Sequence, residues 1–81
     1  MIYYIDTIEQ IVKDGENTEY GGRAKESADL NAVLAKYYKK LSDVSADIGK
    51  NHLFMDIRIV NSLGEVVKKD AVGKYVDATA E

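Results

Sequence analysis

The most constraining feature of the sequence is a single apolar stripe in its middle. Six apolar residues recur at intervals of four and three positions: Leu30, Leu34, Tyr37, Leu41, Val44 and Ile48. This spacing places them on one face of a helix. Ser27 suits the N-cap of such a helix, and Gly49, directly after the stripe, suits its C-terminal cap. The sequence therefore predicts a long helix over residues 26–48 with one buried face.

The segment after the stripe has the alternation of a β-strand. Leu53, Met55, Ile57 and Ile59 occupy every second position, which predicts a strand with one face packed against the helix. The turn-forming residues 61–64 and the β-branched residues after them predict a returning strand over residues 65–69. The opposite face of the first strand is expected to carry His52, Phe54, Asp56 and Arg58.

The N-terminal residues 2–13 are rich in isoleucine and tyrosine, which favours a strand. A rival interpretation is a short helix over residues 6–13, in which Asp6 is the N-cap and Glu9 completes a capping box. Residues 14–25 have no periodic pattern and are interpreted as a loop or a ragged edge strand.

Together these segments predict an α+β fold of order β-α-β-β, with one long helix packed on a small, mostly antiparallel sheet. A chain of 81 residues and 9.0 kDa is long enough for a single domain, residues 1–81, with a frayed tail at about 77–81. A lone helix covers one face of such a sheet. The other face is left open, or something else covers it.

Composition narrows the function mainly by exclusion. There is no cysteine, so disulfides, thiolate zinc sites and thiol catalysis are excluded. The first residues lack the basic start and apolar stretch of a signal peptide, and together with the missing cysteine this predicts a cytoplasmic location. No apolar run is long enough to predict a membrane span. The net charge of −3 argues against general affinity for nucleic acid.

No catalytic constellation is predicted. The only histidine is His52, and Asp56 on the same strand lies about 13 Å away at the usual rise per residue. No phosphate-binding loop and no metal-ligand spacing occurs, so neither a cofactor nor a metal site is expected. An enzyme would need carboxylates such as Asp6 and Asp56 to converge in a pocket. The sequence therefore predicts a non-catalytic protein.

The aromatic residues suggest a surface for a protein partner. Six tyrosines are many for this length, and tyrosine is enriched at interfaces. If residues 2–5 are a strand, Tyr4 joins Phe54 and Arg58 on the open sheet face, while Tyr38 widens the apolar edge of the helix. We therefore expect an interaction or scaffold module that self-associates as a homodimer through Tyr4, Tyr38, Phe54 and Arg58.

The alternative is a weak nucleic-acid or anion-binding accessory protein. Gly21, Gly22, Arg23 and Lys25 come shortly before the helix, and a helix N-terminus attracts anions. Lys36, Lys39 and Lys40 make the helix mildly basic. The acidic net charge disfavours nucleic acid as the partner.

Overall fold

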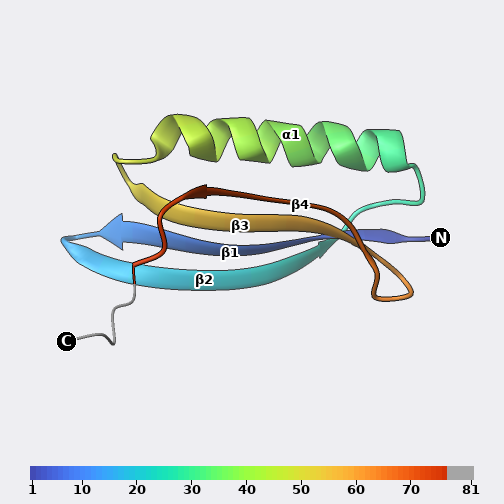
Figure 1. Ribbon diagram of the computed structural model, residues 1–81, viewed down its shortest axis with the longest axis horizontal. Coiled ribbons are helices and arrows are strands. Elements are labelled where there is room, and N and C mark those ends of the chain that lie inside the picture. Colours follow the sequence, from blue (N-terminus) through green and yellow to red (C-terminus); the bar gives the residue numbers. More distant parts are fainter. Residues whose placement is uncertain (77–81) are drawn as a thin grey trace.

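A four-stranded antiparallel sheet lies under one helix in the computed structural model, which describes residues 1–76 (Figure 1). In chain order the elements are β1 (Tyr3–Lys13), β2 (Glu16–Lys25), α1 (Leu30–Asp47), β3 (His52–Asn61) and β4 (Val66–Gly73). The strands are arranged as β2-β1-β3-β4, and every neighbouring pair is antiparallel. The α+β class, with one helix on an antiparallel sheet, agrees with the prediction.

The predicted order β-α-β-β is wrong, because residues 16–25 form a full strand and the order is β-β-α-β-β. Asp14 and Gly15 join β1 to β2, and both have positive φ, 53° and 79°. Such a two-residue turn with positive φ at both positions matches the twist of a hairpin. β2 then pairs with β1 along its whole length. It lacks the apolar alternation of a strand because its side chains are exposed on both faces.

The structure confirms the strand interpretation of the N-terminal segment over the short helix. β1 lies between β2 and β3 and pairs with both. A helix over residues 6–13 would leave β2 without a neighbour. The frayed tail predicted at about 77–81 lies outside the described residues.

α1 is shorter than predicted, because it begins at Leu30 and ends at Asp47. Its N-cap is Asp29, whose Oδ1 accepts hydrogen bonds from the backbone N–H groups of Asn31 at 3.0 Å and Ala32 at 3.4 Å. Ser27, the predicted cap, lies two residues earlier, and its Oγ accepts from the Asp29 N–H. An aspartate at this position stabilises the helix start by about 1 kcal/mol relative to alanine.

The core lies between α1 and the sheet. Tyr37 and Val44 of the predicted stripe are buried, while Leu30, Leu34, Leu41 and Ile48 are partly buried against them. Val33 is a further buried helix residue, and Ile5, Met55, Ile57 and Ile59 complete the cluster from the sheet. α1 packs over β1, β3 and β4 and does not reach β2. The stripe was therefore placed correctly, and the helix covers only part of its sheet face.

A polar contact fixes α1 to β4 inside this core. The ring of Tyr37 is fully buried, and its hydroxyl donates to Asp70 Oδ2 at 2.5 Å. Burial, followed by the hydrogen bond to Asp70, raises the pKa of Tyr37. The same hydrogen bond is the main cause that lowers the pKa of Asp70. The neutral phenol and the ionised carboxylate are thus the favoured pair in the folded protein.

Candidate functional site

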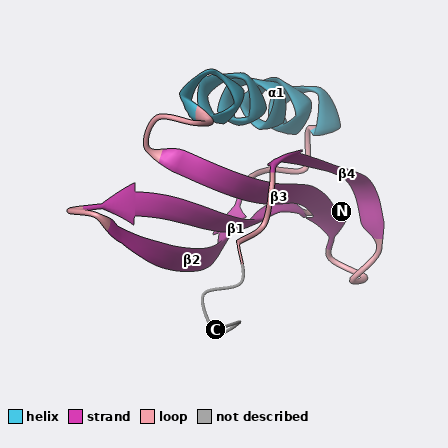
Figure 2. Cartoon of the chain, turned by 60° about the vertical axis from the view of Figure 1, so that its left-hand side comes forward, coloured by secondary structure: helices cyan, strands magenta, loops and turns pink. Residues whose placement is uncertain are grey.

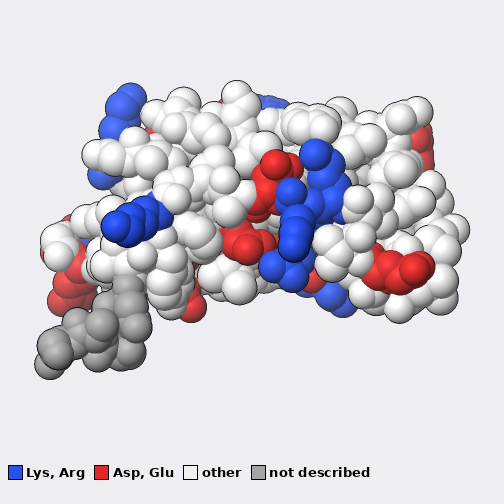
Figure 3. All heavy atoms as spheres, viewed as in Figure 1, with Lys and Arg blue, Asp and Glu red and all other residues white. Residues whose placement is uncertain are grey.

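The face of the sheet turned away from α1 is here called the open face. Strand alternation places on it every second residue of each strand, and the register sets them side by side. Its members are Tyr4, Asp6, Ile8, Gln10, Glu19, Gly21, Arg23, Lys25, Phe54, Asp56, Arg58, Val60, Lys69 and Ala71. Basic and acidic side chains lie next to one another across the middle of the molecule (Figure 3). The open face is therefore a mixed surface of charges and apolar groups.

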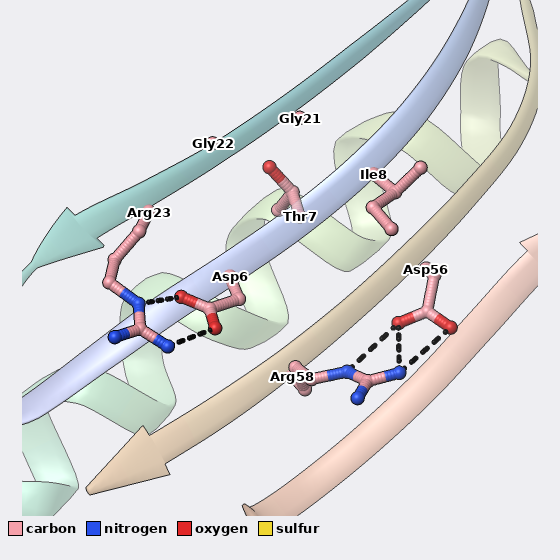
Figure 4. Close-up of a pocket in the computed structure, with 8 residues that line it drawn as sticks. All are labelled: Asp6, Thr7, Ile8, Gly21, Gly22, Arg23, Asp56 and Arg58. Carbon is pink, nitrogen blue, oxygen red and sulfur yellow. Dashed lines mark hydrogen bonds and ion pairs between the residues drawn. The ribbon is translucent and has the colours of Figure 1, made fainter. Parts of the chain in front are cut away.

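A shallow hollow of about 330 Å³ occupies the middle of the open face. Asp6 and Arg23 lie on one side of it and Asp56 and Arg58 on the other, with α1 behind the sheet (Figure 4). Ile8 lies on the same face beside these pairs, and 45% of its surface is exposed. An isoleucine this exposed in the middle of a sheet gives up nearly half of the free energy that full burial would supply.

The charges of the hollow are paired with one another. Arg23 donates to both carboxylate oxygens of Asp6, each at 2.7 Å, which is the bidentate geometry of a strong ion pair. This hydrogen bonding raises the pKa of the Arg23 guanidinium. Arg58 reaches Asp56 on its own strand at 3.3 Å. Asp6 and Asp56 do line one hollow, as an enzyme would require, but each carboxylate is held by an arginine.

The segment of residues 74–76 crosses one end of the open face (Figure 2). The segment leaves β4 at Gly73, whose φ is +77° and whose missing Cβ would lie 2.2 Å from the carbonyl oxygen of Leu53. Only glycine fits there. The Lys74 N–H donates to that same oxygen at 3.1 Å. Gly73 therefore turns the chain from the edge of the sheet onto its open face.

Two residues of the sheet hold this crossing segment in place. The Gln10 amide donates to the Val76 carbonyl at 2.6 Å and accepts from the Val76 N–H at 2.8 Å. The side chain thus bonds both backbone groups of Val76, as the backbone of a neighbouring strand would. The Tyr75 ring packs edge-on against Phe54 with 5.4 Å between ring centroids. The Tyr75 hydroxyl donates to Glu19 on β2 at 2.9 Å. Residues 74–76 thus pack over Phe54 and do not line the hollow.

Three of the four predicted partner-surface residues share one sheet face, but Phe54 lies six positions along β3 from Val60, which pairs with Tyr4, so the two rings are about 20 Å apart. Tyr4, Phe54 and Arg58 lie on the open face. The guanidinium of Arg23 lies 5.1 Å from the centre of the Tyr4 ring. Tyr38 lies in the helix layer, where the sequence placed it, and its ring meets Tyr37 edge-on. These four residues therefore do not form one surface.

The structure places the predicted anion-binding residues away from a helix N-terminus. Gly21, Gly22, Arg23 and Lys25 belong to β2, and the first turn of α1 is already capped by the carboxylate of Asp29. A groove of about 410 Å³ runs between α1 and β2, with Lys36 and Lys40 on its helix side. Lys36 pairs with Glu26 at 2.9 Å and Lys40 with Glu9 at 3.2 Å. The groove cations, like Arg23, are therefore matched by carboxylates.

His52 faces α1 rather than the open face where the sequence placed it. Its Nδ1 lies 2.6 Å from Asp47 Oδ2, and its Nε2 lies 3.1 Å from Glu9 Oε1. The hydrogen bond to His52 is the main cause that lowers the pKa of Asp47. The two carboxylates lie at opposite nitrogens of the ring and do not converge. Within residues 1–76 no group of His, Asp and Glu side chains is arranged to hold a metal ion.

Sequence reasoning missed the roles of Ile8, Gln10, Glu19 and Tyr75. The alternation along β1 contained a signal for Ile8 and Gln10, since Tyr4, Asp6, Ile8 and Gln10 share one face of a strand. The contacts of Glu19 and Tyr75 depend on the crossing segment, and no periodic pattern in the sequence predicts that segment.

Comparison of the chain with protein-family models, with curated proteins and with solved structures gives no significant match. In the part of the chain that is described, no helix combines the length and the apolar character needed to cross a membrane.

Proposed function

We propose that this protein is a non-catalytic interaction module whose partner is a second copy of itself. The observation that carries the proposal is the state of β2. Nine of its ten residues are exposed, α1 does not reach it, and along its outer edge no strand pairs with it among residues 1–76. A bare edge strand offers a row of unpaired N–H and C=O groups to another chain.

The chemistry of the open face supports binding rather than catalysis. The carboxylates of Asp6 and Asp56 are both engaged by arginine side chains. An exposed apolar side chain, Ile8, surrounded by charges of both signs is the composition of a protein-binding surface. Pairing two copies through β2 would also join their two open faces into one larger surface.

The anion-binding alternative has no comparable support. A phosphate-binding groove would offer lysines or arginines without carboxylate partners. Such side chains neutralise the phosphates and thereby release the phosphate counterions into solution, which drives binding. The lysines that line the groove between α1 and β2 are both in ion pairs.

Light scattering behind a size-exclusion column, over a wide range of protein concentrations, tests the proposal. We expect the molar mass to rise from near 9.0 kDa towards twice that value as concentration increases. A molar mass that stays at the monomer value up to the highest concentration would overturn the proposal. An oligonucleotide titration at low salt, where electrostatic binding is strongest, runs alongside. Saturable binding by a strict monomer would move the assignment to the alternative.

A further inference from the structure

Resting on the proposed function, we propose that two copies pair antiparallel through the outer edges of β2, with Gly21 of one chain opposite Gly21 of the other. This pairing would join the two four-stranded sheets into one continuous sheet. The partner, the surface and the register each follow from the residues of β2.

The backbone fixes which residues of β2 can bond outward. Lys13 and Glu16 close the two-residue hairpin and pair with each other. Since bonding direction alternates along an antiparallel strand, the even-numbered residues of β2 bond to β1 and the odd-numbered residues point their N–H and C=O groups outward. The Glu26 N–H donates to the Tyr3 carbonyl at 2.9 Å, as this alternation requires of an even-numbered residue. Asn17, Glu19, Gly21, Arg23 and Lys25 therefore present the free edge.

Centring the pair on Gly21 makes the free edge self-complementary. In a two-fold antiparallel pair, residues whose numbers add to 42 then lie opposite each other on the same face. Glu19 faces Arg23 of the partner subunit, and the two-fold axis repeats this ion pair. Asn17 faces Lys25 of the partner subunit. Opposite charges directly across a strand pair stabilise it.

The two neighbouring two-fold registers fit less well. Centring on Tyr20 sets Glu19 opposite a glycine and forms no charge pair. Centring on Gly22 pairs Glu19 with Lys25 of the partner subunit, but only residues 19–25 then overlap. The register centred on Gly21 pairs residues 17–25 and keeps the charge complementarity.

The helix side of β2 gives the same register a second support. Tyr20 points to that side and is 44% exposed. In the register centred on Gly21 its ring lies over Gly22 of the partner subunit, and an aromatic ring across from a strand glycine is a recognised stabilising pair. The ring would sit beside the groove between α1 and β2, whose floor includes Ile5 and Ala24.

The charged side chains can make this new contact without giving up their present ones. Arg23 contacts Asp6 through Nε and Nη2, which leaves the Nη1 donors of its guanidinium. Glu19 accepts from Gln10 and Tyr75 through Oε1, which leaves Oε2 as an acceptor. The intermolecular ion pair therefore adds to the existing contacts.

Single cysteines test the register directly, because the chain contains no cysteine of its own. Gly21→Cys and Gly22→Cys are matched variants. A Cβ at Gly21 meets only the Thr7 carbonyl oxygen, at 3.9 Å, and a Cβ at Gly22 meets nothing within 4 Å. Neither glycine has positive φ. In the proposed dimer the two Cα atoms at position 21 are about 5.5 Å apart, within the range of a disulfide, whereas those at position 22 are about 7–8 Å apart on a diagonal.

We expect Gly21→Cys to oxidise to a disulfide dimer at a concentration where wild type is dimeric, and Gly22→Cys to stay largely reduced. Preferential cross-linking of Gly22→Cys would overturn the register. Equal cross-linking of both variants, or of neither, would overturn the edge-to-edge pairing. If wild type nevertheless shows the mass of a dimer, only this inference fails and the proposed function stands. If wild type is a monomer, both fail.

Charge reversal tests the same pairing without oxidation. Glu19→Lys alone and Arg23→Glu alone each place like charges across the interface, so each should weaken dimerisation about tenfold. Mixing the two variants restores both opposite-charge pairs, and the mixture should recover dimerisation to near the wild-type level. Lys25→Glu is the matched control, since it faces Asn17 in this register and should change little. Failure of the mixture to recover, with both variants folded by circular dichroism, would contradict the proposal.

Discussion

Replacing Tyr37 with phenylalanine isolates the polar link between α1 and β4. The ring is fully buried, and Tyr37→Phe keeps its packing while removing only the hydroxyl. The lost contact is the hydrogen bond to Asp70 Oδ2 at 2.5 Å. The hydroxyl also lies 3.3 Å from the Ile57 carbonyl, but a hydroxyl has one hydrogen to donate and the carboxylate is the nearer acceptor.

The expected cost follows from the kind of hydrogen bond that is lost. A bond to a charged group contributes about 1.5–3 kcal/mol to stability. The Asp70 side chain is 36% exposed and Lys68 lies 3.4 Å from it, so water and the lysine partly replace the lost donor. We therefore expect the free energy of unfolding to fall by about 1–1.5 kcal/mol at neutral pH. For a domain of this size that lowers Tm by roughly 5–10 °C.

The pH dependence gives this prediction a sharper test. The Tyr37 hydrogen bond lowers the pKa of Asp70, so its stabilisation is full above the unfolded value near 3.9 and is lost as pH falls through the folded value. The pKa of Tyr37 is raised, so stabilisation is also lost as pH rises beyond the unfolded value near 10. The stability difference between wild type and Tyr37→Phe should therefore be largest between about pH 5 and pH 9.

Urea unfolding at low protein concentration, where association contributes least, measures this difference. Tyr3→Phe is the matched control, since within residues 1–76 the Tyr3 hydroxyl makes no hydrogen bond, and its cost should stay below about 0.5 kcal/mol. A Tyr37→Phe cost below about 0.5 kcal/mol, or one that is constant from pH 2 to pH 9, would refute the reasoning.

Gly73→Ala should lower the free energy of unfolding in urea by more than about 2 kcal/mol, because the alanine would combine a positive φ with a backbone clash. The control Gly22→Ala, whose Cβ would lie in open space, should change it by less than about 0.5 kcal/mol. Equal effects of the two substitutions would argue against the turn at Gly73. His52→Ala should raise the pKa of Asp47 towards its ordinary value, because the hydrogen bond to His52 is the main cause of the lowering. An NMR titration that shows no change in the pKa of Asp47 would contradict this. In wild type, the stability that this lowered pKa contributes is present at neutral pH and is lost as pH falls through the lowered pKa. Val33→Ala, at a helix position that is 1% exposed, should cost about 2 kcal/mol in thermal unfolding, and a loss under about 0.5 kcal/mol would show that the helix face is misplaced.

Periodicity predicted the elements that bury one face. The stripe of α1 and the alternation of β3 both arise because one face of the element is buried, so the sequence shows them as apolar periodicity. β2 has no such periodicity, since its side chains are exposed and its stability comes from backbone pairing with β1. The Asp14-Gly15 pair between two extended segments was the one local signal for it.

The candidate site was predictable to the extent that it depends on alternation within a strand. Tyr4, Phe54 and Arg58 fall on one face for that reason. Tyr38 lies on α1, as the helical stripe predicted, and so it does not share the sheet face of the other three residues. The pairing of Arg23 with Asp6 required the hairpin register, and the covering of Phe54 by Tyr75 required the turn at Gly73. Neither is a property of any short segment.

The most direct test of self-association through β2 is amide hydrogen exchange, followed by NMR at two protein concentrations. The even-numbered residues of β2 bond to β1 and should be protected at both. We predict that the outward amides of Glu19, Gly21 and Arg23 exchange rapidly in dilute solution and become protected at high concentration. Rapid exchange of these three amides at both concentrations, with the even-numbered residues still protected, would contradict the account.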